Sequence, residues 1–145
     1  MKKILFVIAL ISSCLIACKS TRNAAQTNAP ADPAQLNGTW ELNYITTSRV
    51  PFKDLYPDKK PTITFNVADT KINGNTGCNT FIGSFSVNGT TIDLSSPLAL
   101  SRMACPGVGE NVFVESLKKV NTYSIDRKIL SLMEDGTETM RFERK

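Results

Sequence analysis

Four cysteines are the residues of this 145-residue chain whose position best predicts their chemistry. Cys14 and Cys18 lie in and just after an apolar N-terminal stretch, whereas Cys78 and Cys105 lie far inside the chain. The segment Leu15-Ile16-Ala17-Cys18 matches a bacterial lipobox, with Leu three positions before the cysteine and Ala directly before it. The pattern predicts cleavage before Cys18 and lipidation of its sulfur. A diacylglyceryl cysteine with an extra N-acyl group would hold the chain firmly on a membrane, since several acyl chains bind where one is marginal.

Residues 1–17 have the composition of an export signal. A basic start at Lys2 and Lys3 precedes a short apolar stretch that ends before the small residue Ala17. The stretch is too short for a bilayer, which needs about 20 apolar residues. Two alternatives are weaker. A buried helix of the fold conflicts with the polar residues 19–22, and cleavage before Cys14 would leave an apolar remnant on the mature chain.

The next segment reads as a flexible tether that includes the lipidated residue. Residues 18–34 contain no large apolar residue after Cys18 and are punctuated by Pro30 and Pro33. The folded domain is therefore predicted over residues 35–145. Lys19 stands where an Asp would mark retention in the inner membrane of some bacteria. We expect a lipid anchor in the outer membrane, facing the periplasm of the bacterial cell envelope.

Cys78 and Cys105 remain once the signal is removed and Cys18 is lipidated. An oxidising compartment favours a disulfide between them. The alternative is a pair of reduced thiols in the core. We expect no metal and no cofactor, because the chain has no histidine and two cysteines make half a zinc site at best.

No constellation of residues predicts catalysis. Histidine is absent, the carboxylates are single and lie mostly at turns, and no Gly-x-Ser-x-Gly elbow or phosphate loop occurs. The basic residues are scattered, which argues against a nucleic-acid partner. The segment 74–80 could be a ligand-binding loop, but a tight turn in which Asn79 bonds the backbone is favoured. The loop 49–61, with two aromatic and several basic residues, is interpreted as solvated rather than as a docking surface.

Most of the domain shows the period-two pattern of half-buried strands. Apolar residues alternate with polar ones, and Asn88-Gly89 and Asp135-Gly136 are hairpin signals. One stretch, residues 108–120, has the period of a helix, with Val112 or Phe113, Leu117 and Val120 on its apolar face. The prediction is an α+β fold: an antiparallel β-barrel-like or strongly curved sheet of about 7–8 strands with one packed amphipathic helix. The strand apolar residues are Trp40, Leu42, Tyr44, Ile63, Phe65, Val67, Phe81, Phe85, Val87, Ile92, Leu94, Tyr123, Ile125, Leu130, Leu132, Met140 and Phe142.

Five motifs in order resemble the META domain, the family of HslJ-like heat-shock lipoproteins. Residues 36–42 are similar to its L-x-G-x-W-x-L opening, and residues 77–83 to its G-C-N-x-[FY]-x-G centre. Residues 101–105 are similar to its T-x-M-A-C segment, with Ser101 where Thr is usual. Residues 110–117 and the pair of segments 130–132 and 140–142 match its helix and its closing hairpin. The motif residues interpreted as structural are Gly38, Trp40, Gly77, Asn79, Phe81 and Met103.

The resemblance implies a small curved antiparallel sheet with one helix and a non-enzymatic envelope lipoprotein, in a family associated with stress response. The leading hypothesis is a monomeric domain that binds or stabilises another envelope protein, with Cys18 as its membrane anchor. The alternative is a carrier of an apolar ligand or lipid, which requires a cavity inside the barrel. An interior filled by Trp40, Phe65, Phe81, Phe85 and Phe113 would leave no room for such a ligand.

Overall fold

The computed structural model describes residues 32–46 and 49–145. The predicted signal (residues 1–17), the lipidation site Cys18 and residues 18–31 of the predicted tether lie outside the described residues. No helix within the described part of the chain is long and apolar enough to cross a membrane.

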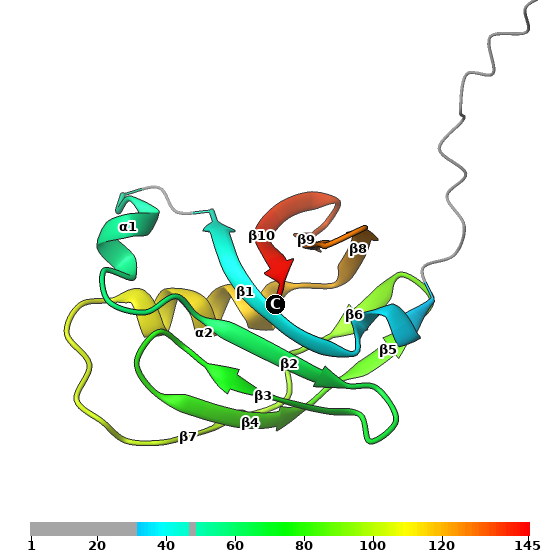
Figure 1. The fold of residues 1–145 in the computed structure, drawn as a ribbon, viewed down its shortest axis with the longest axis horizontal. Coiled ribbons are helices and arrows are strands. Elements are labelled where there is room, and N and C mark those ends of the chain that lie inside the picture. Colours follow the sequence, from blue (N-terminus) through cyan, green and yellow to red (C-terminus); the bar gives the residue numbers. More distant parts are fainter. Residues whose placement is uncertain (1–31, 47–48) are drawn as a thin grey trace, which may run out of the picture.

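Ten antiparallel strands form a single sheet in the order β5-β6-β8-β9-β10-β1-β2-β3-β4-β7 (Figure 1). The strands are β1 Gly38–Ile45, β2 Thr62–Asn66, β3 Lys71–Asn75, β4 Thr80–Ser84, β5 Ser86–Asn88, β6 Thr91–Asp93, β7 Ala99–Leu100, β8 Thr122–Asp126, β9 Ile129–Glu134 and β10 Thr137–Arg144. Three helical segments accompany them: the 3-10 helix η2 Pro33–Leu36, α1 Phe52–Leu55 and α2 Gly109–Lys119.

The sheet is strongly curved, as the sequence predicted. β4 and β5 lie near opposite ends of the strand order, yet Phe85 alone separates them in the chain. The two ends of the sheet must therefore approach each other at Phe85. The helix α2 packs across the concave side, where Phe113 and Leu117 are buried (Figure 1).

The predicted strand count of about 7–8 was too low. β3 was missed because only Ile72 of its five residues carries an apolar side chain into the core, while its polar residues hide the alternation. β7 was missed because it contains only two residues. The alternating residues Phe81, Phe85 and Val87 predict one strand, but Phe81 and Val87 belong to two strands, β4 and β5, that pair with β3 and β6 respectively and are separated by Phe85.

The predicted helix is confirmed as α2, with small differences. Phe113 rather than Val112 is the fully buried member of the apolar face. On the exposed side of the helix, Glu115 pairs with Lys118 at 3.0 Å. The helices η2 and α1 were not predicted. Each is a single four-residue element, too short for a 3.6-residue period to show.

The alternation predicted along β1 fails at its end. Tyr44 is 40% exposed, whereas the next residue, Ile45, is buried. The register with β10 shifts between Leu42 and Tyr44, which marks a bulge. An extra residue reverses the facing of every side chain after it, so Ile45 takes the core position expected for Tyr44.

The interior is filled by side chains. The five aromatic residues that the sequence placed in the core are all buried, and neighbouring rings contact one another. The ring centroids of Phe65 and Phe85 are 5.1 Å apart, and those of Phe81 and Phe113 are 5.9 Å apart. A core of this kind is typical of small barrels whose lumen holds no ligand.

Candidate functional site

The family-like motifs lie near the ends of the strands, at two opposite ends of the domain. The first end, called the entry end, holds η2, the turn 67–70 and the turn 127–128, because Gly38 pairs with Phe65 and Arg144 bonds to Lys128. The second end, called the cleft end, holds α1, the turn 76–79 and the first turn of α2. The turn 76–79 joins β3 to β4 at the end of β3 that lies opposite the turn 67–70 (Figure 1).

At the entry end, Trp40 ties η2 to the sheet. Its indole Nε1 donates a hydrogen bond of 2.8 Å to the carbonyl of Leu36, and both side chains are fully buried. The Arg144 guanidinium lies over the Trp40 ring, 4.0 Å from its centroid, and donates to the carbonyls of Gln35 and Asn37. Trp40 is thus a core residue, as predicted, and Gly38 opens the strand beside it.

At the cleft end, Asn79 joins two distant segments through its side-chain amide. Its Oδ1 accepts from the backbone N–H of Met103 and from the hydroxyl of Ser101, both at 2.8 Å. Its Nδ2 donates to the carbonyl of Met103 at 3.2 Å and contacts Cys105 Sγ at 3.0 Å. The amide therefore pairs with Met103 as a neighbouring strand would. Asn79 is 2% exposed, and this geometry matches the favoured turn interpretation.

Ser101 occupies the position where the family usually has Thr, and its hydroxyl explains the substitution. The hydroxyl donates to Asn79 and accepts from the backbone N–H of Thr80 at 3.1 Å. Either Ser or Thr provides this oxygen.

Glu110 connects the turn 76–79 to the helix α2. Its carboxylate accepts from the Thr76 hydroxyl at 2.6 Å and from Asn79 Nδ2 at 3.2 Å. The Thr76 hydroxyl also accepts from the backbone N–H of Asn79 at 3.0 Å. Asn79 and Glu110 therefore share one partly buried polar network, in which a carboxylate acceptor strengthens the hydrogen bonds.

A disulfide joins Cys78 to Cys105, with their Cα atoms 5.9 Å apart. Both cysteines are half-buried. The bridge links the turn 76–79 to the segment that enters α2, as the sequence predicted.

Tyr56 inserts between two glycines and anchors the loop after α1. A Cβ on Gly77 would lie 2.8 Å from the Tyr56 ring, and one on Gly109 would lie 2.9 Å from it. The Tyr56 hydroxyl donates to the Gly109 carbonyl at 2.9 Å, and burial raises the pKa of this phenol. The prediction of a solvated loop at 49–61 is therefore wrong for Leu55 and Tyr56, which are buried.

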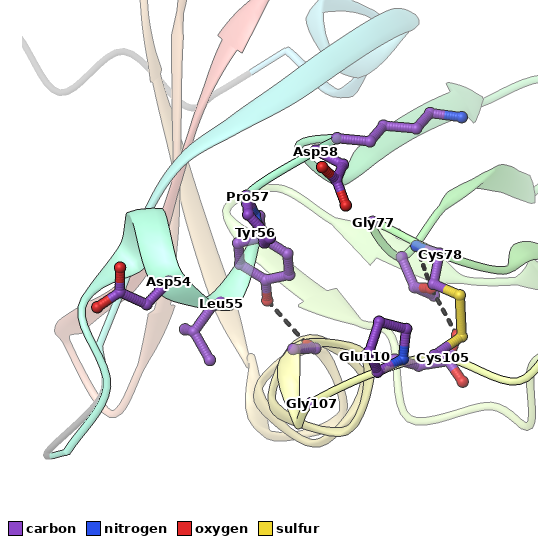
Figure 2. Close-up of a pocket in the computed structure, with 14 residues that line it drawn as sticks. Asp54, Leu55, Tyr56, Pro57, Asp58, Gly77, Cys78, Cys105, Gly107 and Glu110 are labelled. Carbon is purple, nitrogen blue, oxygen red and sulfur yellow. Dashed lines mark hydrogen bonds between the residues drawn. A yellow bond between two sulfur atoms is a disulfide. The ribbon is translucent and has the colours of Figure 1, made fainter.

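These elements surround a surface cleft of about 280 Å³. Figure 2 shows Tyr56 on one side, the disulfide on the other and Glu110 between them. Four charged residues are among those that line the cleft: Asp54, Asp58, Lys59 and Glu110. A separate groove of about 520 Å³ lies between α2 and the loop before α1, with Val50, Val108 and Val112 among its apolar lining.

The segment 101–108 is exposed although it is firmly held at Met103. The Met103 side chain is 58% exposed and that of Val108 is 50% exposed. Met103 was interpreted as structural. Its backbone fits that interpretation, because Asn79 binds it, but its side chain projects into solvent.

The cleft contains some residues that the sequence predicted for a site and some that it did not. Within residues 32–46 and 49–145, no three His, Cys, Asp or Glu side chains are grouped to hold a metal ion. The sequence predicted a bridge between Cys78 and Cys105, and the structure also brings Gly77, Asn79 and Met103 to this end of the domain. Sequence reasoning missed Tyr56 and Gly109, whose contact spans 53 residues and leaves no local signal.

The fold and this end of it define a small, curved antiparallel β domain with a disulfide-braced surface cleft. A profile of the META domain matches residues 34–145, so the chain belongs to the META domain family. The match confirms the resemblance predicted from the motifs.

Three solved structures share the fold. A solution structure of a protein from Burkholderia xenovorans is 23% identical, with a TM-score of 0.61 over 80% of this chain and 88% of the other. A DUF4847 family protein from Bacteroides vulgatus is 19% identical, with a TM-score of 0.51 over 76% and 94%. A further solution structure is 21% identical, with a TM-score of 0.56 over 78% and 94%. No curated protein matches the chain.

Proposed function

We propose that this chain is a non-enzymatic lipoprotein of the bacterial envelope whose META domain binds another envelope protein through its cleft end. The observation that carries the proposal is the segment 101–108. Asn79 fixes its backbone, yet Met103 presents a largely exposed apolar side chain beside the cleft. Because the backbone at Met103 is already fixed, a partner that binds there orders little main chain, which favours recognition.

The position of the cleft relative to the start of the domain supports the same proposal. The chain enters the domain at η2, and the cleft lies at the opposite end of the sheet (Figure 1). A lipid on Cys18 would attach the domain to the membrane through its entry end, so the cleft lies at the end away from the point of attachment. Confinement near a membrane also raises the effective concentration of the domain for an envelope partner.

The proposed carrier of an apolar ligand has less support. Trp40, Phe65, Phe81, Phe85 and Phe113 occupy the interior, and the cleft and the groove are both at the surface. Native mass spectrometry of the protein extracted from envelopes in mild detergent tests the carrier. A stoichiometric lipid in addition to the acyl groups on Cys18 would favour it over the partner-binding proposal.

Photo-crosslinking tests the partner-binding surface. A photoreactive residue replaces Met103, and a matched variant carries it at Ile82, which is 64% exposed on the outer face of β4. We expect a discrete crosslinked protein from position 103 in intact cells and none from position 82. Equal capture at both positions, or none at either, would contradict binding at the cleft end.

The lipid anchor is tested separately. Replacing Cys18→Ala removes the predicted acceptor sulfur, so metabolic labelling with a fatty-acid analogue should be lost, and the protein should leave the membrane fraction. A Cys14→Ala variant is the control and should label normally. Unchanged labelling of the Cys18→Ala variant would refute the lipoprotein assignment.

A further inference from the structure

Residues 104–108 join two well-held parts of the cleft end. Before them, Asn79 binds both the N–H and the carbonyl of Met103. After them, Gly109 is buried against Tyr56. Four of the five residues between these points are exposed, and only Cys105 is half-buried.

The disulfide is the principal tie of this segment to the rest of the domain. Among the described residues, Cys105 is the one member of 104–108 that bonds to another loop. It does so through its bond to Cys78 and the 3.0 Å contact of its sulfur with Asn79 Nδ2. A sulfur atom is a weak acceptor, so the covalent bond provides most of the restraint. Without it, residues 104–108 would form an exposed loop fixed only at its two ends.

The same bridge is open to reagents. Cys78 and Cys105 are both half-buried and both line the cleft, together with Pro106 and Gly107 from the segment itself. Figure 2 shows the two sulfur atoms at the wall of the cleft. Access of a thiolate to one of the sulfurs is a main requirement for thiol–disulfide exchange.

We propose that the Cys78–Cys105 bridge is a redox latch that fixes one wall of the cleft and releases it when a dithiol reduces the bridge. One thiolate of the reductant attacks a sulfur of the bridge, forms a mixed disulfide and expels the other cysteine as a thiolate, which takes up a proton. The second thiol of the reductant then displaces the remaining cysteine. The bridge gains two electrons and two protons, and the reductant becomes a disulfide.

The oxidised domain thus keeps a cleft of fixed shape, and the reduced domain loses the wall formed by residues 105–107. The core does not depend on this bridge, because Met103 and Gly109 remain held by Asn79 and Tyr56. The latch concerns a local segment and does not rest on the proposed envelope partner.

Limited proteolysis of the full mature lipoprotein in detergent tests the latch. The protein is treated with dithiothreitol without denaturant, its free thiols are capped with iodoacetamide and counted by mass spectrometry, and the reagents are removed before the sample is divided between elastase, which cleaves after small residues, and trypsin. Ala104 lies inside the segment and is exposed. Arg127, in the turn between β8 and β9 with a side chain 92% exposed, provides an internal control cleavage site.

We expect two thiols to appear in the native state and elastase cleavage after Ala104 to accelerate at least about tenfold, because cleavage follows local opening. Cleavage after Arg127 should not change. A Cys78→Ser/Cys105→Ser variant should behave like the reduced protein, which separates loss of the bridge from the bulk of the capping group.

Three results would overturn the latch. Thiols that appear only in denaturant would mean that the bridge is inaccessible. Equal acceleration at both sites would mean that the bridge supports the whole fold. Unchanged cleavage after Ala104 in both the reduced protein and the double variant would mean that other contacts hold the segment.

Discussion

The partly buried polar network at the cleft end makes a sharp prediction for Asn79→Asp. The new carboxylate keeps the acceptor for the Met103 N–H and the Ser101 hydroxyl. It loses both N–H donors, and it places a second negative group where Nδ2 now lies 3.2 Å from Glu110 Oε1. The substitution therefore replaces a hydrogen bond by a contact between two carboxylates.

The size of the destabilisation is set by the smaller of two free-energy costs, the repulsion between the two carboxylates and the protonation of one of them. Two unit charges at this separation repel by about 5 kcal/mol at an effective dielectric constant of about 20. The folded protein can instead bind one proton, at about 1.4 kcal/mol for each pH unit above the unfolded Asp pKa of about 3.9. That cost is about 4 kcal/mol at pH 7 and about 1.5 kcal/mol at pH 5. The lost donor to the Met103 carbonyl adds about 1 kcal/mol at either pH.

The sign of the pH dependence is fixed by proton binding. Between these pH values the folded variant binds one proton more than the unfolded chain, so its free energy of unfolding falls as the pH rises. Urea unfolding at pH 5, 6 and 7 should show the deficit of Asn79→Asp relative to the parent growing by about 1.4 kcal/mol per pH unit. Adding Glu110→Gln should abolish this slope, and Asn79→Ala should be destabilised without it. A deficit for Asn79→Asp that is equal at pH 5 and pH 7 would refute the shared network.

Three further substitutions test other contacts by urea unfolding. Tyr56→Phe removes the hydrogen bond to Gly109 and should cost about 1 kcal/mol. Tyr123→Phe should be neutral or stabilising, because among the described residues its hydroxyl is buried without a partner; a loss like that of Tyr56→Phe would show a missed partner. Hydrogen bonding from Arg141 lowers the pKa of Glu138, so this carboxylate stabilises the fold above its unfolded pKa of about 4.3 and loses that effect as the pH falls through its folded pKa. Glu138→Gln should thus be less stable than the parent at pH 7 and should lose this deficit at acid pH; a constant deficit would count against the ion pair.

Period-two and helical patterns predicted the elements that bury several large apolar residues. β1, β2, β9 and β10 were visible because residues such as Trp40, Phe65 and Phe142 alternate with polar neighbours. β3 was not visible because pairing with β2 and β4, rather than its own composition, makes it a strand. The bulge in β1 was hidden for a related reason. Its cause is the register with β10, which lies about a hundred residues later in the chain.

In the candidate site, too, residues with a local sequence signal could be predicted and residues defined by distant contacts could not. Asn79 could be predicted to bond the backbone because an Asn next to a Gly-rich turn commonly does so. Its partner Met103 could be suspected only through the shared disulfide. Tyr56 and Gly109 could not be paired at all, because a glycine that accommodates a ring shows nothing in the sequence except the lack of a side chain.

The two ends of the domain differ in how they combine stability with recognition. At the entry end, Trp40 and Arg144 hold η2 by contacts that bury or stack their own side chains. These side chains are therefore not available to contact a partner. At the cleft end, Asn79 and Tyr56 bind backbone groups of Met103 and Gly109, so the side chains of residues 102–108 other than Cys105 are exposed. A polar network that fixes main chain rather than side chains gives a surface whose shape is constant and whose chemistry is set by exposed residues. Substitution of Met103 should for this reason alter partner binding with little change in stability, whereas substitution of Asn79 should alter both.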